Sequence, residues 1–218
     1  SRLHPLTLQK PKGLLEIGSE TILDRLINQF KKSGISDILI VVGHQKEYLI
    51  NHFGDSVRYC YYKDFFRTNN LHTLWSVRHE LNDDVLITFA DLVVHQTIID
   101  KLLRSKSDIT MAIDTSKVLK STMRVAINNL NVKNITSTTI DEADGNFIGI
   151  SKLSQLGCKT LINEMSELID SNFNDYYTVA IDNIARRGEP VGFCDIKDSL
   201  WREIDTQKEY EELIKIYE

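Results

Sequence analysis

The chain has 218 residues, of which 42% are hydrophobic and 26% are charged. This length and composition fit one globular domain, and such a chain buries roughly 70% of its unfolded surface without disulfide staples. The net charge of −5 argues against a nucleic-acid partner, because nucleic-acid binders usually carry a basic stripe. Cys60, Cys158 and Cys194 form no C-x-x-C motif, and we find no signal peptide and no apolar run of membrane-spanning length. We therefore expect a cytoplasmic protein with free thiols and no membrane partner.

Short apolar runs alternate with amphipathic segments over the first half of the chain, which is typical of an α/β fold with a mostly parallel sheet. A helix is expected over residues 19–34, because Thr21 with Asp24 resembles a capping box and Gly34 can end the helix. The next elements are expected as strand 37–42, helix 45–52, strand 57–62, helix 69–80, strand 85–90, helix 96–104 and strand 108–113.

The pattern changes after about residue 115. Segments 122–136 and 144–152 resemble strands with no helix between them, so we expect a hairpin in a small inserted antiparallel lobe. Further elements are expected as helix 160–170, helix 176–187, strand 190–196 and helix 205–217. The fold class predicted for residues 1–218 is a single α/β domain with a doubly wound, mostly parallel (Rossmann-like) sheet.

The last predicted helix has an apolar face that needs a partner. Tyr210, Leu213, Ile214 and Tyr217 lie on or near one side of it. We expect this side to pack either on the core of the domain or on a second copy in a homodimer.

The stretch SRLHPLTLQKPKGLLEIG, residues 1–18, places Arg2 and Lys12 beside two prolines. Taken alone, it fits an exposed basic loop before a helix. Its order of Ser1-Arg2, Pro5-Leu6-Thr7 and Pro11-Lys12 resembles the signature of the NTP-transferase (sugar-1-phosphate nucleotidyltransferase-like) superfamily, in which G-x-G-[ST]-R-x-x-P-L-T is followed by P-K. The glycines of that signature and the strand before them are not in the chain, so we expect both to precede Ser1.

The resemblance implies roles for the basic residues. Ser1 and Arg2 would belong to the loop that grips the β- and γ-phosphates of the nucleotide, and Lys12 would lie near the α-phosphate and the acceptor. Arg2 and Lys12 are thus the expected catalytic residues. Cations at these places are physically reasonable, because two anions must approach each other during the reaction.

Two aspartates are candidate ligands for Mg²⁺. Asp91 follows the apolar run 85–90, and the carboxyl ends of strands are where open α/β sheets bind ligands. Asp205 lies in the sequence LWREID, and the resemblance implies that it supplies the second carboxylate. Mg²⁺ prefers such hard oxygen ligands together with substrate phosphates. The alternative for both residues is a capping role at the start of the next segment.

Two further motifs narrow the substrate. The segment Arg67-Thr68-Asn69-Asn70-Leu71-His72-Thr73-Leu74-Trp75 is similar to the N-N-x-x-[ST]-[LM] segment of bacterial choline-phosphate and phosphonate cytidylyltransferases. The stretch ADGNFIG, residues 143–149, is similar to another segment of that group. The resemblance therefore implies CTP and a small phosphonate or phosphorylated headgroup as substrates.

The remaining candidate site residues follow from this interpretation. Gly43, His44 and Asn70 are expected to contact the nucleotide, and Asn70 is also a candidate acceptor contact. Asp114, Asp144 and Trp201 are expected to bind the acceptor, since an aromatic ring and carboxylates suit a cationic headgroup. Each has a structural alternative: Asp114 as a cap, Asp144 as part of a turn, Trp201 as a core residue and His44 as an ordinary loop residue.

Three other functions remain open from the sequence. One is a sugar-1-phosphate nucleotidyltransferase that makes a nucleotide sugar, and another is a non-catalytic nucleotide-binding regulatory subunit. A small-molecule binder of some other α/β family is the third. A P-loop NTPase is rejected, because the segment Gly13-x-x-x-x-Gly18-Ser19 lacks the lysine before its serine.

Overall fold

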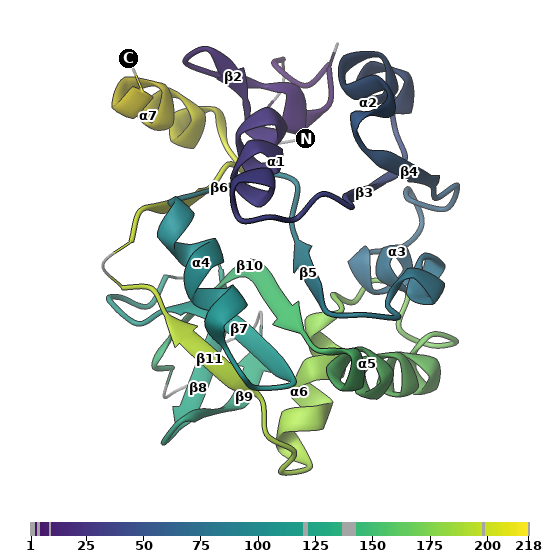
Figure 1. The fold of residues 1–218 in the computed structure, drawn as a ribbon, viewed down its shortest axis with the longest axis vertical. Helices are drawn as coiled ribbons and strands as arrows, with labels where there is room; N and C mark the ends of the chain where they lie inside the picture. Colours follow the sequence, from purple (N-terminus) through teal and green to yellow (C-terminus); the bar gives the residue numbers. More distant parts are fainter. Residues whose placement is uncertain are drawn as a thin grey trace. The chain divides into compact units, whose positions relative to one another are not determined.

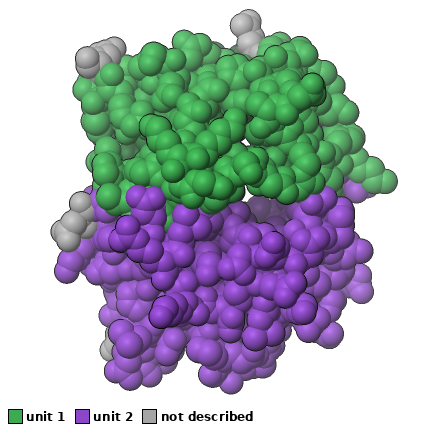
Figure 2. Space-filling model, viewed as in Figure 1, with its two compact units in different colours: residues 1–63, 89–99, 200–218 green, residues 64–88, 100–199 purple. Residues whose placement is uncertain are grey.

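The computed structural model describes residues 3, 5–8, 10–119, 122–136, 143–197 and 199–217 (Figure 1). The chain divides into two compact units, which Figure 2 distinguishes by colour. The first unit comprises Ser1–Lys63, Phe89–Ile99 and Leu200–Glu218, and the second comprises Asp64–Thr88 and Asp100–Ser199. The first unit is thus assembled from three separate stretches of sequence.

Among the described residues, the first unit contains three two-stranded sheets: β1 with β2 antiparallel, β3 with β4 parallel, and β6 with β12 antiparallel. Its elements are η1 (Lys12–Leu14), β1 (Glu16–Ile17), β2 (Glu20–Thr21), α1 (Ile22–Lys32), β3 (Leu39–Val42), α2 (Lys46–Phe53), η2 (Gly54–Ser56), β4 (Arg58–Tyr61), β6 (Leu92–Val94), β12 (Trp201–Glu203) and α7 (Gln207–Tyr217). Helix α4 (Gln96–Arg104) begins in this unit and continues into the other.

The predicted capping box at the first helix is confirmed. The Asp24 amide donates to Thr21 Oγ1 at 3.1 Å, and the Thr21 amide donates to Asp24 Oδ2 at 3.1 Å. The helix nevertheless starts at Ile22 rather than at residue 19, because the residues before it form the hairpin β1–β2. Gly18 makes the turn of this hairpin with a φ of 62°, a value that glycine adopts without steric cost.

The strands β6 and β12 were not predicted. They pair Leu92 with Glu203 and Val94 with Trp201, across more than a hundred residues of sequence. Each strand has only three residues, which is too short for a recognisable period-two pattern. This pairing joins the segment that follows Asp91 to the segment that precedes Asp205.

The apolar face of α7 packs on the core of the first unit. Leu213 is fully buried there, and Tyr210 and Tyr217 pack against the same cluster. The other members of this cluster are Leu3, Leu15, Ile17, Ile22, Val93 and Ile204, with Leu6 at its edge. This contact agrees with the first of the two expectations for the last helix, and a homodimer stays a prediction.

The second unit is built on a six-stranded sheet with the order β5-β10-β7-β11-β9-β8 (Figure 1). Its elements are α3 (Asn70–Ser76), η3 (Arg78–Glu80), β5 (Val85–Thr88), β7 (Ile109–Asp114), β8 (Met123–Asn128), β9 (Asn131–Thr136), β10 (Gly145–Leu153), α5 (Gln155–Leu168), α6 (Thr178–Arg186) and β11 (Gly192–Asp195).

The α/β class is confirmed, but the sheets are mixed rather than mostly parallel. In the six-stranded sheet, β11 runs parallel to β7, whereas β10 runs antiparallel to β5, β7 and β8. A parallel neighbour needs a long crossover connection, usually a helix. Between β7 and β10 the chain forms the hairpin β8–β9, so β10 returns in the opposite direction. The sequence predicted a hairpin between segments 122–136 and 144–152; the structure divides the first segment into β8 and β9 and pairs β10 antiparallel with β8.

Helix α5 begins at Gln155, five residues before its predicted start. Ser154 caps it, with Oγ accepting from the Gly157 amide at 3.1 Å. Glycine lowers helix propensity, which weakens the sequence signal in this first turn. Close packing requires glycine at position 157, because a Cβ there would lie 2.0 Å from the Asp108 carbonyl oxygen.

In the described part of the chain, no helix has both the length and the apolar character that crossing a membrane requires. Cys60, Cys158 and Cys194 are free thiols. Burial, together with the nearby carboxylates of Asp84 and Asp83, raises the pKa of Cys158 to about 11. The thiol of Cys158 is therefore protonated near neutral pH.

Candidate functional site

Lys12 and the two predicted metal ligands meet in the first unit. Lys12 Nζ lies 2.5 Å from Asp91 Oδ2 and 2.9 Å from Asp205 Oδ1. The three side chains come from distant parts of the sequence and are each only 23–31% exposed. The structure thus brings together three residues that the sequence had singled out separately.

The backbone of η1 fixes the position of Lys12. Pro11 precedes this turn with a φ of −58°, and its carbonyl accepts from the Leu14 amide at 2.9 Å. Gly13 allows a close approach, because a Cβ there would lie 2.5 Å from the Leu23 side chain and 3.3 Å from the Ala90 carbonyl oxygen. Lys12 therefore stands beside the turn that carries Asp91.

Neither aspartate serves as a helix cap. Asp91 is followed by strand β6 instead of a helix. The helix after Asp205 is capped by Thr206 and Glu209, since the Glu209 amide donates to Thr206 Oγ1 at 3.2 Å and the Thr206 amide donates to Glu209 Oε2 at 2.8 Å. The capping alternative for Asp205 and Asp91 is therefore not supported.

A third carboxylate, Glu203, joins these two and was not predicted. Asp91, Glu203 and Asp205 form what we call the carboxylate cluster, in which one oxygen from each lies within 4.8 Å of the others. Glu203 ends β12, and residues two apart on extended backbone point to the same side. The spacing Glu203-Ile204-Asp205 was the available signal, and it becomes informative only once the strand is known.

Charge and burial act together on this cluster. Burial, followed by the negative charges of Asp91 and Asp205, raises the pKa of Glu203 to about 7. Burial alone would lower the pKa of Lys12, but the charges and hydrogen bonds of Asp91 and Asp205 outweigh it and raise that pKa. Lys12 is therefore cationic at neutral pH, and the cluster carries more negative charge than one ammonium group balances.

The carboxylate cluster can hold a divalent cation. Asp91 Oδ1 is buried, and no described residue donates a hydrogen bond to it. A buried carboxylate oxygen without a partner is costly, and a metal ion would satisfy it. Three carboxylate oxygens also match the hard ligands that Mg²⁺ and similar ions prefer.

The residues predicted on the nucleotide side are placed in different parts of the chain. Ser1 and Arg2 lie outside the described residues. Gly43 and His44 form the turn between β3 and α2 in the first unit, with His44 exposed. Asn70 opens α3 in the second unit, where its Oδ1 accepts from the Tyr177 amide at 2.8 Å. The roles of these residues toward a nucleotide stay predictions.

The predicted acceptor residues all have structural contacts within their own units. Asp114 ends β7 and its Oδ1 accepts from the Ser116 amide at 2.9 Å, while Asp144 Oδ2 accepts from the Ile127 amide at 2.6 Å. Trp201 is 7% exposed in β12. These contacts agree with the structural alternatives for Asp114 and Trp201, whereas Asp144 is hydrogen-bonded to β8 and does not lie in a turn. The roles of all three residues toward an acceptor stay predictions.

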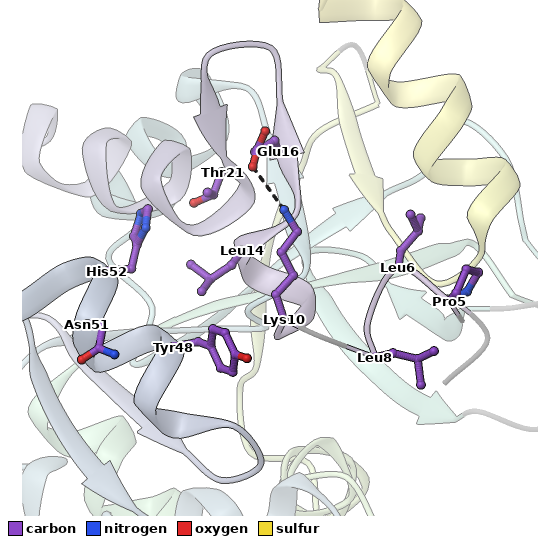
Figure 3. A pocket seen from close by; sticks show the side chains of 10 residues that line it. All are labelled: Pro5, Leu6, Leu8, Lys10, Leu14, Glu16, Thr21, Tyr48, Asn51 and His52. Atoms are coloured by element: carbon purple, nitrogen blue, oxygen red, sulfur yellow. Dashed lines mark hydrogen bonds and ion pairs between the residues drawn. The ribbon is translucent and has the colours of Figure 1, made fainter.

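The first unit also contains an open cavity of about 830 Å³, shown in Figure 3. Helix α2 contributes Tyr48, Asn51 and His52 to its wall, and Lys10 pairs with Glu16 at 3.1 Å across another part. Lys12 and the carboxylate cluster are not among the residues that line it. This cavity is therefore distinct from the group of residues around Lys12.

Known proteins are similar to this chain over most of its length. Residues 1–213 match the model of a MobA-like NTP transferase domain. A CTP:phosphoglutamine cytidylyltransferase of Campylobacter jejuni is 26% identical over 97% of this chain and 94% of its own length. The choline-phosphate cytidylyltransferase of Streptococcus pneumoniae is 31% identical, over 48% of this chain and 46% of its own.

A solved structure shows the same fold. The structure of a CTP:phosphocholine cytidylyltransferase from Streptococcus pneumoniae aligns with a TM-score of 0.79 and 20% identity. The alignment covers 100% of this chain and 94% of that one. The sequence match, the fold and the meeting of Lys12 with Asp91 and Asp205 lead to one conclusion: the chain belongs to the MobA-like NTP transferase family.

Proposed function

We propose that this protein is a Mg²⁺-dependent cytidylyltransferase. It transfers CMP from CTP to a small phosphorylated or phosphonate headgroup and releases pyrophosphate. The observation that carries this proposal is the placement of Lys12 between Asp91 and Asp205. The names of the Campylobacter jejuni and Streptococcus pneumoniae relatives support CTP as the nucleotide.

The reaction needs charge neutralisation more than proton transfer. A phosphate ester has a second pKa of about 6, so the acceptor oxygen is already anionic at neutral pH. This oxygen forms a bond to the α-phosphorus of CTP, and the bond from that phosphorus to the bridging oxygen breaks as pyrophosphate leaves. No side chain has to act as a general base, and positioning with charge stabilisation supplies the rate.

Lys12 and the carboxylate cluster have distinct tasks in this scheme. The ammonium group of Lys12 reduces the repulsion between the acceptor and the α-phosphate. Asp91, Asp205 and Glu203 would hold Mg²⁺, and the ion when bound neutralises phosphate charge. The unpartnered Oδ1 of Asp91 is the oxygen of this set that most needs such a ligand.

Pyrophosphate release by the full-length protein tests the proposal. Each of the four NTPs is supplied with Mg²⁺ and with phosphocholine, phosphoethanolamine, O-phospho-L-serine, 2-aminoethylphosphonate or glucose 1-phosphate. We expect release with CTP and one or more headgroups, and its loss in EDTA. Release with glucose 1-phosphate and another NTP, but none with CTP, would instead make the protein a nucleotide-sugar-forming enzyme.

A further inference from the structure

The second unit contains a cavity of about 220 Å³ that the reaction scheme above leaves unexplained. Pockets for drug-sized ligands occupy roughly 300–1,000 Å³, so this one suits a smaller group. Its polar wall includes Asn174, Asp175, Thr178, Asp182 and Arg186. The lining therefore contains two carboxylates and one guanidinium group, and of these Asp175 Oδ2 accepts a hydrogen bond from Asn172 Nδ2.

Asp182 and Arg186 form a fixed pair of opposite charges on α6. Arg186 Nε donates to Asp182 Oδ2 at 2.6 Å, and the Ile135 amide donates to Asp182 Oδ1 at 2.6 Å. Strand β9 thereby holds the carboxylate, whose side chain is 14% exposed, while Arg186 is 56% exposed. Since the contact uses Nε, the two terminal nitrogens of the guanidinium can face an anion.

The loop that carries Asn174 and Asp175 is tied to the Asn69-Asn70 motif. The Asn69 amide donates to the Phe173 carbonyl at 2.8 Å, and the Tyr177 amide donates to Asn70 Oδ1 at 2.8 Å. Asn69 Nδ2 also donates to the Asn174 carbonyl at 3.2 Å, and the Leu71 amide to the Asp175 carbonyl at 3.2 Å. The motif therefore shapes one wall of the cavity.

The lining favours one chemical class of ligand. Carboxylates attract an ammonium group, and a guanidinium binds a carboxylate through two parallel hydrogen bonds. A quaternary ammonium group would instead favour several aromatic faces, whereas Tyr176 is the aromatic residue in the described lining. A group that carries both an ammonium and a carboxylate would satisfy both kinds of charge.

We propose that this cavity binds a zwitterionic amino-acid group, with Asp182 and Asp175 facing the ammonium and Arg186 facing the carboxylate. Two sources could supply that group: the headgroup of the acceptor itself, or a free amino acid that binds separately. The first source rests on the proposed function, and the second does not.

Two phosphorylated compounds that differ by one carboxylate test the inference by calorimetry. O-phospho-L-serine carries the α-carboxylate that phosphoethanolamine lacks. We expect the protein to bind phosphoserine at least about tenfold more tightly, as for a charge-assisted contact. Arg186→Gln should remove this preference and leave phosphoethanolamine binding unchanged. Arg187→Gln, next to it but outside the cavity lining, is the matched control, and thermal melting checks that each variant folds.

The possible outcomes distinguish the acceptor's headgroup from a free amino acid as the ligand. They also distinguish the proposed amino-acid site from the proposed cytidylyltransferase function. If Arg186→Gln raises the KM of phosphoserine in the CTP assay without changing the KM of CTP, the group is the acceptor's own. If L-serine alone binds, and Arg186→Gln abolishes that binding while acceptor kinetics stay unchanged, the site takes a free amino acid. Equal affinity for phosphoserine and phosphoethanolamine in the wild type would overturn the inference, even if CTP turnover is found. The calorimetric preference would uphold it even if no turnover is found.

Discussion

Lys12 Nζ lies 2.5 Å from Asp91 Oδ2, although 79 residues separate the two in sequence. Removing two charges from water costs free energy, and the attraction in a half-buried ion pair offsets that cost only if the surrounding structure fixes both side chains in a good geometry. Here η1 holds one partner, and the turn before β6 holds the other. The fold therefore holds this ion pair in a fixed position before any substrate binds.

Lys12→Ala and Asp91→Ala should each reduce the rate of pyrophosphate release by about a hundredfold or more, as expected for lost transition-state charge stabilisation. Lys10→Ala is the matched control, because Lys10 pairs with Glu16 and not with the carboxylate cluster. Circular dichroism and melting establish that the variants fold. Turnover like the wild type in both Lys12→Ala and Asp91→Ala would refute the site assignment.

Glu203→Gln should raise the Mg²⁺ concentration for half-maximal activity. The expected rise is about tenfold or more, the scale seen when a group that ligates or supports a metal is altered. A Mg²⁺ titration at fixed CTP measures it, with the exposed Glu47→Gln as control. An unchanged Mg²⁺ dependence would remove Glu203 from the metal site and leave Asp91 and Asp205 as its candidates.

In a chelating buffer, the raised pKa of Glu203 should make stability fall as pH rises. The pKa of Glu203 is about 7 in the folded protein, against 4.5 for an ordinary glutamate carboxyl, so only the folded state keeps this proton between those pH values. The free energy of unfolding should therefore drop across pH 4.5 to 7, by roughly 2 kcal/mol after allowing for partial exposure. Urea unfolding of the wild type and of Glu203→Gln measures the free energy of unfolding of each. Between pH 4.5 and 7, the variant should become increasingly more stable than the wild type.

Asn70→Ala should weaken acceptor binding through the loop that it holds. The variant loses the oxygen that accepts from the Tyr177 amide, and a lost hydrogen bond of this kind costs about 0.5–1.5 kcal/mol. We expect a higher KM for the acceptor and little change in the KM for CTP. Asn70→Asp keeps an accepting oxygen and should restore the acceptor KM. If Asn70→Asp behaves like Asn70→Ala, the hydrogen bond to Tyr177 is not what matters.

The local sequence was sufficient for several elements. Thr21 and Asp24 predicted the capping box of α1, though not its first residue, because a capping box is made by neighbouring residues. An antiparallel extension after residue 115 was also expected, since segments 122–136 and 144–152 lack a helical period between them, and β8, β9 and β10 form it. Lys12, Asp91 and Asp205 were found through motifs whose residues lie close together in the chain. Their role in the reaction stays a prediction.

Tertiary structure decided the rest. Glu203 enters the carboxylate cluster only because β12 pairs with β6, and three-residue strands leave no periodic signal. The antiparallel direction of β10 depends on the route of the whole inserted segment. Asp182 and Arg186 line a cavity only because β9 and the loop beside Asn70 lie next to α6 in the folded chain. Local hydrogen bonds and hydrophobic periodicity depend on neighbouring residues, so the sequence reveals them. The partners of short strands and the walls of a cavity depend on segments that meet only in the folded chain.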